Sequence, residues 1–231
     1  MYDILETDLS FEYLNRISQI KNTVVMGGWA IYFYVNENYR RAFGLDYLKS
    51  RDIDVYVNSK YLNTFIEEIK KLGISPTSYF FRYELIYSRS KSKIITEKES
   101  KKQQIYDLVY VFLDLFTNKK SEKAWNVDTF NKAKVFIIEK INTFDINTLL
   151  ALKCVSFFER EKLDKEFKDA CDIYVLLIYS GKKFKISNNI RNSIEKIIKR
   201  RDLSEFIAEN VLRDVTKVNI VISTLKNLLK R

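Results

Sequence analysis

The stretch VVMGGWAIYFYVNENYRRAFGLDYLKSRDIDVYV, residues 24–57, decides the expected fold. It opens with a short apolar run that stops at Gly27 and Gly28, and it closes on a β-branched run that Asp52 and Asp54 enter. Residues two apart in a strand point to the same face, so these two carboxylates should project together. They would repel each other without a cation between them, and Mg²⁺ uses carboxylate pairs together with substrate phosphates. We therefore expect a metal site here.

The glycine pair predicts the other half of the same site. Gly27 and Gly28 follow an expected strand at residues 23–26 and precede an apolar segment that should form a buried helix. Because they have no side chains, their backbone N–H groups can approach phosphate oxygens closely at a helix N-terminus. We expect this helix to end near Tyr34, and residues 36–50 to form a polar connection to the aspartate strand.

An apolar-Gly-Gly turn, a helix, and then Asp-apolar-Asp-apolar form a pattern that resembles the signature of the DNA polymerase beta-type nucleotidyltransferase superfamily. Here it reads MGG at residues 26–28 and DIDV at residues 52–55. Many members have Ser or Thr after the glycines, whereas this chain has Trp29 and Ala30. The resemblance implies an α/β (α+β) fold in which a polymerase beta-like mixed sheet carries helices.

The later part of the chain extends the resemblance. Residues 149–153 read LLALK, Arg160 follows seven residues after Lys153, and residues 168–172 read KDACD ahead of an apolar run. This order resembles the second half of AbiEii-type nucleotidyltransferases, which are known as toxins of toxin–antitoxin and phage-defence systems. The resemblance implies a nucleotidyltransferase core over residues 1–144, then a C-terminal helical bundle with a basic tail over residues 145–231, with the active site between them.

The third carboxylate of the expected site is open between two residues. The segment IYDLVYVFLDLF, residues 105–116, is nearly continuous apolar sequence and should form a central strand. It holds Asp107 and Asp114, which are seven apart and therefore on opposite faces of a regular strand. A charge in a central strand is costly unless it is paired or bound to a metal. We favour Asp114, which lies deeper in the apolar run, and keep Asp107 as the alternative.

The resemblance implies Mg²⁺ (or Mn²⁺) as cofactor and an NTP as substrate, and its metal-binding acids map onto Asp52 and Asp54. Asp114, chosen from the strand pattern, would be the third metal ligand, with Asp107 as the alternative. Lys153 would be the essential lysine and Asp169 the downstream acid, which completes the catalytic set. The candidate nucleotide-binding residues are Gly27, Gly28, Arg51, Lys153 and Arg160.

Composition limits the chemistry and suggests a partner. The chain has no histidine, which excludes Ser-His and Cys-His nucleophiles and HExxH zinc sites. Its net charge is +10, and from Gly181 onward thirteen Lys and Arg face five Asp and Glu. An excess confined to one region favours a polyanionic partner, although a solvated basic face of a bundle explains it equally well. The candidate RNA-binding residues are Lys199, Arg200 and Arg201.

The function expected from the sequence is therefore Mg²⁺-dependent transfer of a nucleotide from an NTP to an acceptor, with an RNA or tRNA end as the first choice. A cognate antitoxin is a possible partner, no membrane segment is expected, and the location should be cytoplasmic. One alternative is a catalytically inactive nucleotidyltransferase fold that binds nucleic acid or a partner protein. Another is nucleotidylation of a protein or a small molecule.

Overall fold

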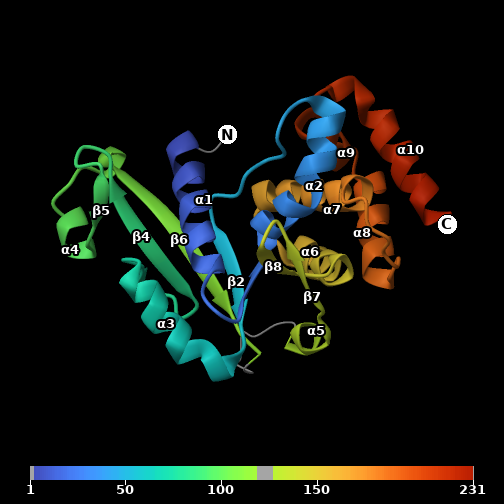
Figure 1. Cartoon of the computed structure of the whole chain (residues 1–231). Helices are drawn as coiled ribbons and strands as arrows, with labels where there is room; N and C mark the ends of the chain where they lie inside the picture. Colours follow the sequence, from blue (N-terminus) through green and yellow to red (C-terminus); the bar gives the residue numbers. More distant parts are fainter. Residues whose placement is uncertain (1–2, 119–126, 231) are drawn as a thin grey trace. The chain divides into compact units, whose positions relative to one another are not determined.

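A computed structural model of the chain describes residues 3–118 and 127–230 (Figure 1). The chain divides into two compact units, a sheet unit and a helical unit, and each is built from two segments. The sheet unit comprises Met1–Tyr32 and Leu48–Phe144, and the helical unit comprises Phe33–Tyr47 and Asp145–Arg231. Within the described ranges, no helix is both long enough and apolar enough to span a bilayer.

The sheet unit contains a mixed eight-stranded sheet in which seven strands follow the order β3-β4-β6-β2-β1-β8-β7 and β5 pairs with β4. Strand β1 is antiparallel to β2 and parallel to β8, while β6 is parallel to β2 and antiparallel to β4. The strands are β1 Thr23–Met26, β2 Ile53–Val57, β3 Ser75–Pro76, β4 Arg82–Ser88, β5 Lys93–Ile95, β6 Leu108–Phe116, β7 Val135–Ile138 and β8 Ile141–Phe144.

Strand β6 lies between β4 and β2, the central position expected from its apolar sequence. It begins at Leu108, so the strand predicted over residues 105–116 is too long at its start. The three residues before it form a 3₁₀ turn, η2 Ile105–Asp107. Asp107 ends that turn because its carboxylate accepts hydrogen bonds from Ser88 and from the backbone of Ser90. The prediction that Asp107 and Asp114 occupy opposite faces of one strand is therefore wrong.

The helices of the sheet unit pack on this sheet or join its strands (Figure 1). Helix α1 contacts β1 and β6, and the Trp29 indole N–H donates to the Ser10 hydroxyl of α1 over 2.9 Å. The segment after β4 forms β5 and a helical turn closed by a Thr96–Glu99 capping box. The helical segments here are α1 Ile4–Ser18, η1 Ser59–Tyr61, α3 Leu62–Lys71, α4 Glu97–Ser100 and α5 Val127–Lys132.

Helix α2 runs through Gly27–Phe43 and is longer than predicted. The residues after Tyr34 were expected to leave the helix because they are mostly polar. They stay helical because their polar groups have partners in the helical unit: the Tyr39 hydroxyl donates to the Val211 carbonyl over 2.7 Å, and the Asn38 amide donates to the Tyr179 carbonyl over 2.9 Å. Tyr39 is fully buried there.

The helical unit is formed by the end of α2 and by the helices that follow the sheet. Asp145 is the N-cap of α6, and its carboxylate accepts from the backbone N–H groups of Asn147 and Thr148. The apolar run of α7 is buried in the bundle. The elements are α6 Ile146–Glu159, α7 Leu163–Tyr179, α8 Asn188–Lys199, α9 Arg201–Asn210, η3 Val215–Lys217 and α10 Val218–Leu229.

Candidate active site

Four neighbouring strands of the sheet unit align the candidate residues side by side. We call the line Arg82–Asp114–Asp54–Gly27, with Asp52 just ahead of β2, the row. Asp54 in β2 is directly opposite Asp114 in β6, and Asp114 is directly opposite Arg82 in β4. On the other side, Asp54 is opposite Met26, the last residue of β1, and Gly27 follows at once. Residues directly opposite on paired strands point to the same face. The carboxylates of Asp54 and Asp114 are therefore neighbours on one face of the sheet.

Asp52 lies one residue ahead of β2, which begins at Ile53. Its carboxylate accepts a long hydrogen bond of 3.4 Å from Arg51, and its backbone carbonyl accepts one of 3.0 Å from the Ser50 hydroxyl. About a third of the Asp52 side chain is exposed, since its relative exposure is 35%. The predicted carboxylate pair therefore consists of one strand residue, Asp54, and one residue at the mouth of the strand.

Arg82 was not identified from the sequence and contributes the closest contact in the row. Its Nε and Nη2 atoms each donate a 2.6 Å hydrogen bond to one oxygen of Asp114. The hydrogen bonds to Asp114 raise the pKa of Arg82, and the charges of Asp52 and Asp54 raise it further. The positive charge of the Arg82 guanidinium is therefore stabilised by all three carboxylates. The signal available in the sequence was a single arginine inside the aromatic segment YFFRYELIY, residues 79–87.

Gly27 is placed against the carboxylate of Asp54. Its φ angle is +63°, and a Cβ atom added there would lie 1.8 Å from Asp54 Oδ2 and 2.8 Å from Asp54 Cβ. A rotation of the Asp54 side chain could move the oxygen but not the Cβ atom, so any larger residue would have to shift β1 or β2. Gly28 lies in the first turn of the 17-residue helix α2. The N-terminus of that helix favours negative charge beside it.

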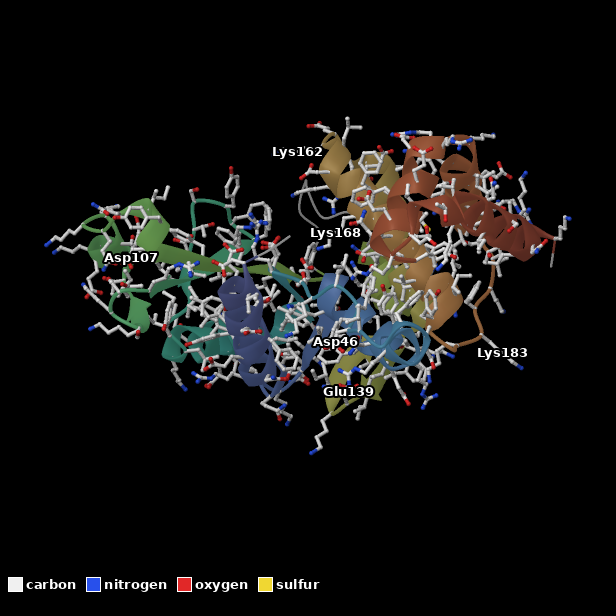
Figure 2. The ribbon with its side chains drawn as sticks, turned by 90° about the horizontal axis from the view of Figure 1, so that it is seen from above. Asp46, Asp107, Glu139, Lys162, Lys168 and Lys183 are labelled. Atoms are coloured by element: carbon white, nitrogen blue, oxygen red, sulfur yellow. The ribbon has the colours of Figure 1, made fainter. Side chains whose placement is uncertain are left out.

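The structure separates the two candidates for the third carboxylate. Asp107 lies in the 3₁₀ turn before β6, seven residues ahead of Asp114. Its oxygens accept hydrogen bonds of 2.8 Å from the Ser88 hydroxyl and 2.6 Å from the Ser90 backbone. Figure 2 shows Asp107 at the end of the sheet unit that carries α4 and β5. Asp114 is the residue that stands beside Asp54.

The row fits a divalent cation in its chemistry. Asp52, Asp54 and Asp114 offer carboxylate oxygens, the ligands that Mg²⁺ and Mn²⁺ prefer, and nitrogen or sulfur ligands are absent from the set. As the side chains stand, no three acidic or cysteine side chains among residues 3–118 and 127–230 converge closely enough to hold an ion. Asp114 does not converge with the other carboxylates because both of its oxygens accept hydrogen bonds from Arg82.

The helical unit contains the second predicted cluster. The Lys153 ammonium lies 2.9 Å from an oxygen of Asp169 and 2.7 Å from an oxygen of Asp172, and both aspartates are almost fully buried. Arg160 donates to the other oxygen of Asp169 over 2.9 Å, and the buried Tyr47 hydroxyl donates to Asp172 over 2.9 Å. Sequence order alone had pointed to Lys153, Arg160 and Asp169, whereas Tyr47 is contributed by the segment that follows α2.

Electrostatics within this cluster are balanced. Burial alone would lower the pKa of Lys153, but the charges of Asp169 and Asp172 outweigh it and raise that pKa. Burial would likewise raise the pKa of Asp169, but the charges of Lys153 and Arg160 outweigh it and lower that pKa. Lys153 thus pairs with two buried carboxylates, and Arg160 supplies the second positive charge of the cluster. The assignment of Lys153 as a nucleotide-binding residue stays a prediction, and any substitution there will also disturb the bundle.

The predicted RNA-binding residues differ from one another in their surroundings. The Arg200 guanidinium lies 2.7 Å from buried Glu166 of α7, so it helps to join the α8–α9 corner to the bundle. Arg201 pairs with Glu205 one turn later in α9, and Lys199 is exposed at the end of α8. Lys199 and Arg201 can therefore contact an external anion more readily than Arg200 can.

Comparison with solved structures identifies the fold. A candidate nucleotidyltransferase from H. pylori matches with a TM-score of 0.56 at 14% identity, over 97% of this chain and 93% of that one. The chain has a nucleotidyltransferase fold. The predicted fold class, a mixed sheet with helices followed by a helical region, is therefore confirmed.

Two further structures are similar to this one. Protein JHP933 from Helicobacter pylori matches with a TM-score of 0.50 at 13% identity, over 100% of this chain and 95% of that one. An antigenic nucleotidyltransferase-like protein from Paracoccidioides brasiliensis matches with a TM-score of 0.48 at 16% identity, over 89% and 93%. No protein-family model matches the sequence, and no curated protein matches it.

The contact between Gly27 and Asp54 can be tested with a matched pair of substitutions. Gly27→Ala and Gly44→Ala both place a side chain at positive φ, but nothing lies within 4 Å of the Cβ position at Gly44. Each should lose about 1 kcal/mol from left-handed strain. Gly27→Ala should lose about 1–3 kcal/mol more from the clash with Asp54. Urea unfolding measures the difference, and equal losses would contradict a tight contact.

The role of Lys153 as a counter-ion can be tested through pH. Lys153→Ala leaves two buried carboxylates without their ammonium, so it should lower the free energy of unfolding near pH 7 by about 3–5 kcal/mol. Below about pH 4 the deficit should shrink, because protonation of Asp169 removes the charge that Lys153 balances in the wild type. Lys165→Ala, an exposed change in α7, is the control. A deficit that is independent of pH would show that lost packing, and not charge, is the cause.

Proposed function

We propose that this chain is a nucleotidyltransferase that moves a nucleoside monophosphate from an NTP to an acceptor hydroxyl. The acceptor oxygen forms a bond to the α-phosphorus, the bond from that phosphorus to the pyrophosphate oxygen breaks, and the hydroxyl proton is released. The observation that carries the proposal is the row Gly27–Asp54–Asp114, with Asp52 at its mouth. The fold, shared with a candidate nucleotidyltransferase, supports it.

The residues of the row have distinct tasks in this proposal. Asp52, Asp54 and Asp114 would hold Mg²⁺ or Mn²⁺, which when bound neutralises phosphate charge and makes an attacking hydroxyl more acidic. Gly27 and Gly28 begin a long helix, so their N–H groups suit phosphate oxygens. The Gly27 position also fixes where the Asp54 carboxylate can lie, since no side chain fits between them.

Lys153 and Arg160 of the helical unit stay our proposed nucleotide-binding residues. Arg160 keeps about a third of its side chain exposed while it pairs with Asp169, whereas the Lys153 side chain is 14% exposed and holds two carboxylates. Arg160 is therefore the better placed of the two for a direct phosphate contact. Lys153 and Asp169 would act by holding Arg160 and the helix end in place. Arg51, which is 39% exposed beside Asp52, is a third candidate.

The acceptor that the charge distribution favours is the end of an RNA, with tRNA as the first choice. The surplus of cations after Gly181 is the supporting observation, and Lys199 and Arg201 are its exposed members at the α8–α9 corner. Modification of an RNA end would be consistent with a toxin of the AbiEii type, held in check by a cognate antitoxin. Such a protein would act in the cytoplasm.

One observation favours a different function. The Arg82 guanidinium already neutralises Asp114, as would suit a catalytically inactive fold that only binds nucleic acid or a partner protein. This alternative predicts binding of RNA without any transfer. The two functions therefore separate in a single assay that follows both binding and product.

The transfer reaction is tested by Asp54→Asn. We expect the rate of transfer to fall at least about a hundredfold. This is a larger loss than is usual when a residue that only hydrogen-bonds to a metal ligand is replaced. Stability should be unchanged or slightly higher, because relief of repulsion between neighbouring carboxylates favours the variant. The assay incubates each α-labelled NTP with Mg²⁺ and total RNA, and resolves labelled RNA, protein and small molecules.

Asp107→Asn is the matched control, because it makes the same change in the same sheet unit at a residue far from the row. It should transfer at the wild-type rate. Near wild-type transfer by Asp54→Asn would contradict the proposed site. Label found in polypeptide or in a small molecule would keep the reaction and change the acceptor.

The acceptor proposal is tested at the α8–α9 corner with Arg200 left in place. Lys199→Gln combined with Arg201→Gln should weaken tRNA binding and flatten its salt dependence by about two units of log–log slope, one per lost phosphate contact. Lys70→Gln with Lys71→Gln, two exposed lysines of α3, makes the same charge change elsewhere. Equal effects from the two pairs would show that net charge, and not this corner, determines binding.

A further inference from the structure

Arg82 occupies the place where a cation would act on the third carboxylate. Its Nε and Nη2 atoms contact the two oxygens of Asp114 at 2.6 Å each, a bidentate pair that is among the stronger side-chain contacts. The Arg82 side chain is 27% exposed and that of Asp114 is 13% exposed, so the pair is shielded from most of the solvent. A divalent cation bound by Asp114 would have to take at least one of these oxygens.

The guanidinium is held firmly in this position. Its central carbon lies 5.0 Å from the ring centre of Phe112, two residues before Asp114 on the same strand. The ring of Phe81, the neighbour of Arg82 in the chain, lies 6.0 Å away. Both distances are within the range of cation–π attraction. Backbone pairing of β4 with β6 fixes the register between Arg82 and Asp114.

Charge explains why the protein keeps an arginine here. Asp54 and Asp114 are direct neighbours on paired strands, and Asp52 also lies close enough for its charge to act on Arg82. Without a metal ion, these carboxylates repel one another. Arg82 supplies a positive charge to all three and so stabilises the metal-free sheet.

We propose that Arg82 is a built-in competitor of the divalent cation, which must displace it from Asp114 to bind, so that Arg82 sets the metal affinity of the row. This rests on the proposed function. The displaced guanidinium remains beside Phe112 and becomes available to a phosphate, which it can bind in the same bidentate way. An NTP therefore offers Arg82 a new anionic partner when the metal ion removes the old one. Metal and nucleotide should consequently bind cooperatively in the wild type.

The test measures Mn²⁺ binding by electron paramagnetic resonance with the full chain and without nucleotide. Arg82→Gln should bind Mn²⁺ about tenfold more tightly than the wild type, because a charged hydrogen-bonded pair no longer has to be broken. Arg82→Lys keeps the charge without the two-pronged geometry and should be intermediate. Arg16→Gln removes the same charge from an exposed pair with Glu12 in α1 and should change nothing.

A double-substitution cycle shows whether the competition acts at Asp114. In an Asp114→Asn background, Arg82→Gln should give no further gain in Mn²⁺ affinity, since the pair is already broken. A second readout is thermal: metal-free Arg82→Gln should melt below the wild type, and saturating Mn²⁺ should raise its melting temperature more than it raises that of the wild type. A non-hydrolysable NTP analogue should tighten Mn²⁺ binding in the wild type and less so in Arg82→Gln.

The outcomes separate this inference from the proposed function. Unchanged or weaker Mn²⁺ affinity in both Arg82 variants, with transfer intact in the wild type, would overturn the inference alone. Arg82→Lys keeps the test decisive if Arg82→Gln does not fold. Absence of specific Mn²⁺ binding in every variant, Asp54→Asn included, together with absence of transfer would overturn both. A gain in Arg82→Gln that persists in the Asp114→Asn background would show a general charge effect and would also overturn the inference.

Discussion

The repulsion between Asp54 and Asp114 is the constraint on which the sheet unit depends. The two residues are directly opposite on paired strands, and backbone hydrogen bonding leaves them no freedom to move apart. A positive charge on one side of the two carboxylates and free space on the other side reduce this repulsion. Arg82, opposite Asp114, provides the charge, and the missing side chain of Gly27 provides the space for Asp54. A sheet that kept the carboxylates without both devices would be destabilised at its centre.

The helical unit uses the same principle with the signs arranged differently. There, two buried aspartates share one largely buried lysine, while an arginine also pairs with Asp169 and a tyrosine donates to Asp172. Burial of any one of these groups alone would be costly, but the set is nearly neutral as a whole. Glu166 repeats the pattern between Lys196 and Arg200. Charged groups inside this protein therefore occur as compensated sets, which is why a single substitution in either unit tests the set and not one residue.

The sequence predicts correctly those parts of the structure that depend on short local patterns. The glycine pair and the aspartate strand are visible as short motifs, and the mixed sheet with its helices was implied by the family resemblance that these motifs carry. The prediction fails where partners come from far along the chain. The end of α2 looks polar, and its partners Tyr179 and Val211 lie well over a hundred residues later. Arg82 was missed for the same reason, because its role depends on the strand register that pairs it with Asp114, 32 positions away.

The path of the chain through its two units has a practical meaning for anyone who wishes to express them separately. The helical unit takes Phe33–Tyr47 from the first part of the chain and the rest from beyond Phe144. A single truncation after Phe144 would leave the fully buried Tyr39 and the nearly buried Tyr47 on a fragment that lacks the bundle around them. Such a fragment would expose these aromatic side chains to solvent and tend to aggregate. The fold is thus interleaved and not modular, so evolutionary exchange of the helical unit by a single recombination event would be disfavoured.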